Sequence, residues 1–341
     1  MAHDLGHPPF GHIGEHTLNE LVLKDGNQDG FEGNAQSFRI VTKLGVRFEN
    51  SPGLNLTRAT LNAILKYPWI RDHKDPKKVN KWSVYESERN EFEFVRGYGD
   101  KDGPEIPCDE HQCIGAALMD WADDIAYSVH DLEDFQRAGV MPWLYMFTKD
   151  GTDSLIRGAL KAWHNAPVNA ESMMIAAWEG LREHIEPLTM ITSELYDGSR
   201  PQRVVLRSLT SSLIGRFASA TTVSDDTTCE PVVKPLAIES EVRLLKQITR
   251  DYIISTPALI AQQHGQKRII AGLFDAIINS CGGDPPPFTP PRFRYLWKLS
   301  EGRRSRFAAD FIASLTEAQA TALYGRLYGT SAGSVLDPIV R

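Results

Sequence analysis

The sequence has few cysteines and no long apolar run, and each shortage narrows the class of protein. Its 341 residues hold only four cysteines, which is too sparse for a disulfide framework and typical of a reducing cytoplasm: Cys108, Cys113, Cys229 and Cys281. No stretch approaches the ~18 consecutive apolar residues that indicate a membrane span. The opening MAHDLGHPPF also lacks the basic and apolar regions of a signal peptide. We therefore expect a cytoplasmic protein without a membrane segment.

An excess of positive charge is missing too. The formal net charge is -7, which argues against a general nucleic-acid coat because backbone binding draws mainly on Lys and Arg. One basic cluster near the end leaves single-stranded nucleic acid open as a partner, although the net charge does not indicate it. The cluster comprises Arg292, Arg294, Lys298, Arg303, Arg304 and Arg306. Such clusters are more often solvated surface.

The spacing of apolar residues predicts a mainly α fold. Apolar side chains recur every three to four residues over 13–23, 59–66, 114–136, 153–163, 171–196, 203–217, 238–254 and 266–278. One interval differs, because Thr-Thr-Val and Pro-Val-Val within 218–233 favour a small inserted β-hairpin.

The first sixteen residues hold the densest set of potential metal ligands. His3, His7, His12 and His16 alternate there with Asp4 and Glu15. The adjacent His3 and Asp4 offer a nitrogen and a carboxylate oxygen to one ion, a mixed set that suits Mn²⁺, Fe²⁺, Co²⁺, Ni²⁺ or Mg²⁺. A lone His-Asp dipeptide is usually a capping or surface feature, but the surrounding glycines and prolines fix the direction of the chain here.

His12 and Glu15 stand three apart at the start of an expected helix, so their side chains share one face. A carboxylate beside a histidine raises the pKa of the imidazole and fixes its tautomer. The pair therefore suits proton donation to a leaving oxygen.

A second polar concentration lies in MDWADDIAYSVHDLEDF. Asp123, Tyr127 and Asp131 follow one another at intervals of four, so a carboxylate, a phenol and a carboxylate face one way. An acidic helix face is usually just solvated. Like charges at this density destabilise a bare helix, however, and a bound cation would relieve them.

Three other segments carry weaker signals. Lys66 is expected at the end of an amphipathic helix that Pro68 stops, and it could meet a polyphosphate, though a surface lysine is the plainer interpretation. Asn34 and Gln36 lie at a turn into a helix, where Asn34 either caps the helix or contacts a substrate. Cys108, His111 and Cys113 lack a second pair at zinc-finger spacing, so we predict no zinc site there.

Five motifs occur in an order that resembles a known family. AHDLGHPPFGHIGE, FEGNAQSFRI, LTRATLNAILKYPW, ADDIAYSVHDLED and RFAADFIASLTEAQA are similar to segments of the HD-domain deoxynucleoside triphosphate triphosphohydrolases, or dGTPase-like enzymes. The resemblance implies an HD-domain helical fold with its phosphohydrolase core in residues 1–140 and a helical C-terminal part in 141–341. It also implies a homo-oligomer.

The resemblance implies a role for each motif residue. His3, Asp4 and Asp123 would hold a divalent metal such as Mn or Mg, and His12 with Glu15 would form the catalytic pair. His7 and Lys66 would lie at the substrate phosphates, Tyr127 under the deoxyribose, and Asp131 at its 3′-hydroxyl. The reaction would convert a dNTP, dGTP foremost, and water to a deoxynucleoside and inorganic triphosphate.

One departure from the family pattern changes the expectation. The family has a further metal-binding histidine in a helix upstream of the His-Asp pair, and only Met1 and Ala2 stand before His3 here. We therefore expect three protein ligands, weaker metal binding and low turnover. Two alternatives stay open: a non-catalytic nucleotide-binding homologue, and another HD-type phosphohydrolase that releases orthophosphate.

Overall fold

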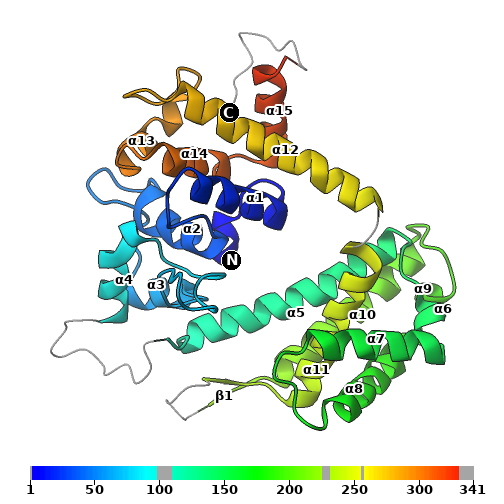
Figure 1. Cartoon of the computed structure of the whole chain (residues 1–341). Coiled ribbons are helices and arrows are strands. Elements are labelled where there is room, and N and C mark those ends of the chain that lie inside the picture. Colours follow the sequence, from blue (N-terminus) through cyan, green and yellow to red (C-terminus); the bar gives the residue numbers. More distant parts are fainter. Residues whose placement is uncertain (1, 98–109, 225–230, 255–256, 330–341) are drawn as a thin grey trace. The chain divides into compact units, whose positions relative to one another are not determined.

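The computed structural model describes residues 2–97, 110–224, 231–254 and 257–329, and it confirms the predicted mainly α fold. The chain divides into two compact units, residues 1–117 with 262–341, and residues 118–261 (Figure 1). The predicted phosphohydrolase core in residues 1–140 is a functional division that these two units do not test, and it stays a prediction. Within the described ranges, no helix combines the length and the apolar character that a bilayer crossing demands.

The first unit combines the start and the end of the chain. From the N-terminal part come Ala2–Gly6 (η1), Gly11–Lys24 (α1), Gly33–Arg39 (α2), Ile40–Leu44 (η2), Arg58–Ile64 (α3), Glu86–Glu88 (η3) and Arg89–Arg96 (α4). The later part supplies most of Pro257–Ser280 (α12), then Pro291–Phe293 (η5), Tyr295–Leu299 (α13), Arg304–Ala313 (α14) and Glu317–Leu327 (α15). Leu18, Phe307 and Phe311 are fully buried where α1 and α14 pack together.

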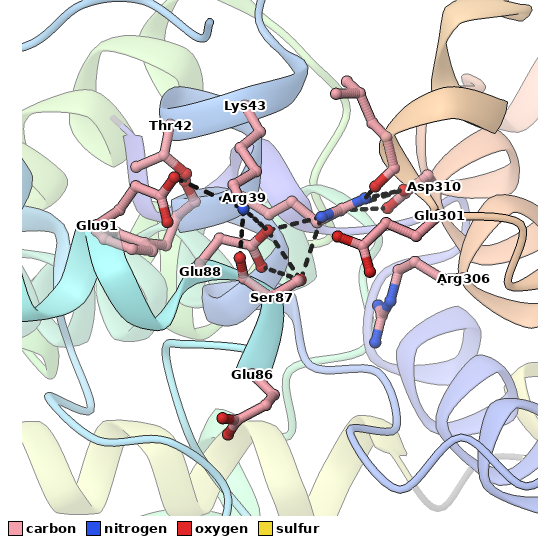
Figure 2. Close-up of polar contacts among 12 residues, drawn as sticks. Arg39, Thr42, Lys43, Glu86, Ser87, Glu88, Glu91, Glu301, Arg306 and Asp310 are labelled. Atoms are coloured by element: carbon pink, nitrogen blue, oxygen red, sulfur yellow. Dashed lines mark hydrogen bonds and ion pairs between the residues drawn. The ribbon is translucent and has the colours of Figure 1, made fainter.

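A buried ion cluster joins α2 to α14 inside this unit. Arg39 has no exposed side-chain surface, and its guanidinium lies 2.6 Å from Glu88 and 2.9 Å from Asp310. Figure 2 shows Arg39 between these two carboxylates. Burial opposes the charge on Arg39, but the two carboxylates outweigh it and raise the pKa of the guanidinium. The cluster fixes the C-terminal end of α2, whose first turn faces the histidine-rich segment.

The second unit is a helical bundle with one hairpin. Its elements are most of Ile114–Arg137 (α5), then Trp143–Met146 (α6), Lys149–Ala162 (α7), Ala170–Ile185 (α8), Thr189–Thr192 (α9), Arg200–Ser219 (α10), Thr222–Val223 (β1), Val232–Val233 (β2), Leu236–Thr249 (α11) and Arg250–Ile254 (η4). Trp143 and Trp178 are buried in its core. The predicted hairpin is confirmed, because β1 and β2 pair antiparallel with Val223 opposite Val232.

The helix predicted over 171–196 is broken. Helix α8 ends at Ile185 and α9 begins at Thr189, with Pro187 between them. Proline has no N–H to donate and disfavours helical geometry in the residue before it. The helix therefore ends before Pro187, although apolar residues continue at helical spacing beyond it.

Candidate active site

The histidine-bearing start of the chain is held against the first turns of α2. Gly6 lies so near that an added Cβ would come within 2.1 Å of the carbonyl oxygen of Gly33. The N–H of Gly6 donates to Oγ of Ser37 over 2.9 Å, and the same Oγ lies 2.7 Å from the carbonyl oxygen of His3. Only glycine fits at position 6, so η1 has a defined place on α2.

His3 and Asp4, the predicted ligands in η1, form an adjacent nitrogen and oxygen pair. Nε2 of His3 lies 3.0 Å from Oδ2 of Asp4, and Oδ1 of Asp4 lies 3.4 Å from Nε2 of His7. The Asp4 side chain is 61% exposed, whereas His3 is largely buried. An imidazole nitrogen and an open carboxylate at this separation fit a divalent ion of the Mn²⁺ or Mg²⁺ kind. The ligand role of the pair stays a prediction.

Glu15 on α1 lies between two imidazole rings. Its Oε2 is 3.4 Å from Nδ1 of His12 and 3.5 Å from Nδ1 of His7. The rings of His7 and His12 are nearly perpendicular, with centroids 5.4 Å apart. The predicted proximity of His12 and Glu15 is confirmed, since residues three apart on a helix meet on one face. His12 is exposed and Glu15 is buried, so the imidazole can reach a substrate while the carboxylate holds it.

Sequence reasoning missed two members of this cluster, Lys81 and Glu32. Nζ of Lys81 lies 2.8 Å from Oε1 of Glu15 and 2.9 Å from Oε1 of Glu32. Lys81 stands 66 positions from Glu15, so no local spacing could link them. The only sequence signal for Glu32 is a carboxylate next to Phe31 at a helix start.

These contacts set the charge of Glu15. Burial disfavours its charged form, but hydrogen bonds from His12 and His7 and the ammonium of Lys81 outweigh it, and together they lower the pKa of Glu15. The hydrogen bond to Glu15 in turn raises the pKa of His7, against the effect of burial. Glu15 is therefore an ionised acceptor at neutral pH and orients both rings.

The same three side chains could themselves approach a metal ion. One ligand atom from each of His7, His12 and Glu15 lies within 4.8 Å of the others. The ammonium of Lys81 already contacts the other oxygen of Glu15, however, and it would repel a second cation at this distance. The arrangement suits proton transfer better than metal binding.

Asn34 and Gln36, the predicted substrate contacts on α2, are both buried. The capping reading of Asn34 is wrong, because Glu32 is the N-cap and accepts from the backbone N–H of Asn34 and of Ala35. The side-chain nitrogen of Asn34 also donates to Glu32 over 3.0 Å. A carboxylate that gathers these donors fixes the first turn of α2.

Gln36 faces the buried ion cluster. Its Nε2 donates to Oδ1 of Asp310 over 2.9 Å, while its Oε1 is buried and has no hydrogen-bond partner among the described residues. A contact between this oxygen and a substrate stays a prediction.

Lys66 does not end a helix as predicted. Helix α3 ends at Ile64, and Leu65 leaves helical geometry with ψ 82°. Gln112 donates to the carbonyl oxygen of Lys66 over 2.9 Å, which ties this loop to the segment before α5. Lys66 is half-buried. Its contact with a substrate phosphate stays a prediction.

Tyr127 and Asp131 on α5 meet, as their spacing predicts. Burial and the hydrogen bond to Asp131 raise the pKa of Tyr127 to about 12. Burial also raises the pKa of Asp131, against hydrogen bonds from Tyr127 and Thr249. Asp123 lies one turn earlier on the same helix and is partly exposed. All three belong to the second unit, and the metal role of Asp123 stays a prediction.

The cysteine-bearing segment before α5 and the basic cluster near the end of the chain are the two remaining sequence features. Cys108 lies outside the described residues, while Cys113 is a free thiol next to the start of α5. The basic cluster is not wholly a surface patch, because Arg306 is buried, donates to the carbonyl oxygen of Gly30 and covers the ring of Tyr85. This arginine supports the core of the first unit and cannot meet nucleic acid.

The helical fold, the His-Asp pair and the His-Glu pair are consistent with the HD-domain phosphohydrolase family. In agreement, the model of the phosphohydrolase-associated domain matches residues 232–326.

Three curated relatives share the name deoxyguanosinetriphosphate triphosphohydrolase-like protein. That of Streptomyces coelicolor is 35% identical over 96% of this chain and 76% of its own length. That of Corynebacterium diphtheriae is 34% identical over 94% of this chain and 74% of its own. The Vibrio parahaemolyticus protein is 28% identical over 97% and 76%. The chain therefore belongs to the deoxyguanosinetriphosphate triphosphohydrolase-like family.

Proposed function

We propose that this chain hydrolyses deoxynucleoside triphosphates, dGTP foremost, to the deoxynucleoside and inorganic triphosphate. The observation that carries the proposal is the contact of Glu15 with His12 and His7 on one side and with Lys81 on the other. Family membership supports the choice of substrate, since the relatives are named for dGTP.

His12 is the proposed general acid. Its ring is exposed, and a proton on Nδ1 is held by Glu15, so Nε2 is the atom left to face a substrate. In the proposed reaction, water adds to the α-phosphorus and releases a proton to the solvent, the bond to the 5′-oxygen breaks, and His12 protonates the departing oxygen and is then reprotonated from the solvent. Positioned proton transfer of this kind contributes about 10²–10⁴-fold to a rate.

His3, Asp4 and Asp123 are the proposed holders of a divalent metal, Mn, Mg, Co, Ni or Fe. When bound, such an ion neutralises charge on the α-phosphate and orients the attacking water. Asp4 suits the task because its carboxylate is open to solvent and His3 lies beside it.

The remaining motif residues are the proposed substrate contacts. His7, with its raised pKa, is suited to carry positive charge beside phosphate, as is Lys66. Tyr127 is proposed to pack under the deoxyribose and Asp131 to accept its 3′-hydroxyl. Asn34 and Gln36 are proposed to act from α2. We also propose a cytoplasmic homo-oligomer.

The direct test is incubation of the full chain with dGTP, each other dNTP and GTP, in Mn²⁺ or Mg²⁺, with chromatographic identification of the products. We expect deoxyguanosine and inorganic triphosphate from dGTP, and little product from GTP. Orthophosphate as the product would replace the proposal with another HD-type phosphohydrolase. Nucleotide binding without any product would replace it with a non-catalytic binding protein.

His12→Ala tests the proposed acid, and His16→Ala is its matched control. His16 lies on the same helix, is equally open to solvent and contacts Glu20 instead of Glu15. We expect H12A to lose at least about 10²-fold in kcat while Mn²⁺ binding is retained, and H16A to be unchanged. An equal rate in H12A and wild type would remove His12 from the mechanism.

A further inference from the structure

A surface pocket of the second unit is lined mainly by arginine. It has a volume of about 390 Å³ and lies where the end of α5 meets the start of α10. Its lining residues are Arg137, Arg200, Arg203, Val204 and Arg207. The volume is within the range of small-molecule sites, and four guanidinium groups around one hollow are unusual in a chain whose net charge is -7.

The arginines of α10 share one face of the helix without a counter-charge. Arg200, Arg203 and Arg207 are exposed and follow one another at intervals of three and four. In the described part of the chain, no carboxylate forms an ion pair with any of them. Like charges at this spacing destabilise a helix, so an anion bound between them would relieve a repulsion that the fold leaves uncorrected.

The fourth arginine has partners of its own. Arg137 at the end of α5 bonds to Glu133, whose other oxygen accepts from Thr210 over 3.0 Å, and it lies 4.0 Å from the exposed Asp134. Both oxygens of Glu133 are therefore engaged, and this carboxylate is not available to neutralise α10. The carboxylates of Glu133 and Asp134 face four arginines, so the pocket keeps a net positive charge.

The first turn of α10 adds to this field. Ser199 is its N-cap residue, and the Ser199 side chain makes no capping hydrogen bond to a described residue. The N-terminal end of a 20-residue helix carries partial positive charge, and the arginines begin at its first residue.

We propose that this pocket binds a linear polyphosphate anion through Arg200, Arg203 and Arg207. Planar guanidinium groups bind phosphate oxygens in a bidentate fashion, and their spacing along the helix fits an anion that extends over several phosphates rather than one. The anion is inorganic triphosphate or the triphosphate of a nucleotide. The choice between these two anions rests on the proposed function. The site itself rests on the positions and charges of the arginines.

The test is calorimetric titration of the full chain with inorganic triphosphate in metal-free buffer, for wild type and for Arg203→Ala/Arg207→Ala. We expect wild type to bind, with an affinity that falls as salt rises, and the double variant to bind about tenfold more weakly or worse. No binding to wild type, or equal binding to both proteins, would overturn the proposal.

The matched control is Arg157→Ala/Lys161→Ala. This pair lies on α7 in the same unit, is exposed and four residues apart, and does not line the pocket. It removes the same two charges, so we expect wild-type affinity. A loss equal to that of R203A/R207A would show a general charge effect and overturn the site.

Titrations with dGTP and deoxyguanosine separate the two sources of the anion. If free triphosphate is the ligand, R203A/R207A weakens triphosphate and dGTP binding by the same factor. If the ligand is a nucleotide, dGTP binds wild type more tightly and loses more. Deoxyguanosine binding that depends on these arginines would contradict phosphate recognition. In H12A, triphosphate binding is expected to persist, so failure of the proposed hydrolysis and failure of this site are distinguishable.

Discussion

Two ion clusters of the first unit have a similar arrangement of charges but differ in solvent exposure. One surrounds Arg39 and the other Lys81, and in each a cation lies between two carboxylates. Arg39 and both of its partners have no exposed side-chain surface, whereas Lys81 is 40% exposed. The same charge pattern thus occurs once in the core and once at the protein surface.

The cation in each cluster matches its position. The guanidinium of Arg39 donates to Asp310 through Nε and Nη2, a fork that fixes both groups, whereas an ammonium offers a point charge on a flexible stem. The buried cluster can only hold helices together. The open one also contains His7 and His12, so its carboxylate can serve a reaction at the surface.

Arg39→Met is expected to cause the largest effect. It leaves Asp310 as a buried carboxylate without its ion-pair partner and leaves Glu88 with only Lys43, 3.5 Å away, which costs about 3–5 kcal/mol of unfolding free energy. Urea unfolding of the full chain measures it.

Arg89→Met is the control for that loss. Arg89 also binds a glutamate, Glu86, but both side chains are about half exposed, so we expect a change of roughly 0–1 kcal/mol. Similar losses in R39M and R89M would mean that burial does not decide how much an arginine–carboxylate pair contributes to stability.

Lys81→Met should change chemistry more than stability. Lys81 is one of the groups that lower the pKa of Glu15, so its removal raises that pKa. If hydrolysis needs the ionised carboxylate, the acid limb of the kcat profile moves to higher pH. At a given pH on that limb, activity then falls about tenfold for every pH unit by which the limb has moved. The profile of dGTP hydrolysis, followed from neutral pH down to the lowest pH at which the chain stays folded, measures it.

Two further variants sharpen this prediction. Lys81→Arg keeps the charge and should restore most of the wild-type profile. Lys78→Met removes a neighbouring lysine that bonds to Glu110 instead, and should leave the profile in place. A uniform drop in kcat at every pH in K81M would mean that Lys81 supports the fold and does not tune Glu15.

The sequence predicts the parts of the site that are local. His12 with Glu15, and Tyr127 with Asp131, are three and four apart on helices, so helix geometry alone brings them together. The helical class and the hairpin were predicted for the same reason, because their patterns span a few residues.

Contacts between side chains far apart in the sequence cannot be predicted from local spacing. Lys81 meets Glu15 across 66 positions, and Arg39 meets Asp310 across 271. Nothing in local spacing distinguishes these side chains from surface charges, since burial decides their role and burial depends on the whole fold. Arg306 was misplaced for this reason: it stands in a basic stretch yet is buried against Tyr85.

Ser37→Ala should produce the smallest effect, and it tests whether the open cluster depends on the packing of η1. The Ser37 hydroxyl accepts from the N–H of Gly6 and lies within hydrogen-bond distance of the carbonyl oxygens of His3 and Gly33. Its loss removes a net stabilisation of about 1 kcal/mol from the segment that carries the proposed ligands. Mn²⁺ affinity, measured by calorimetry, should then fall roughly fivefold.

Thr42→Val is the matched control, because it also removes one buried hydroxyl. The Thr42 hydroxyl donates to the carbonyl oxygen of Phe38, four residues earlier, and makes no hydrogen bond to a described residue of η1. We expect S37A to bind Mn²⁺ more weakly than T42V while their unfolding free energies are similar. Equal Mn²⁺ affinity in S37A and wild type would mean that the position of His3 on α2 does not limit metal binding, and that the ligands can order themselves around the ion.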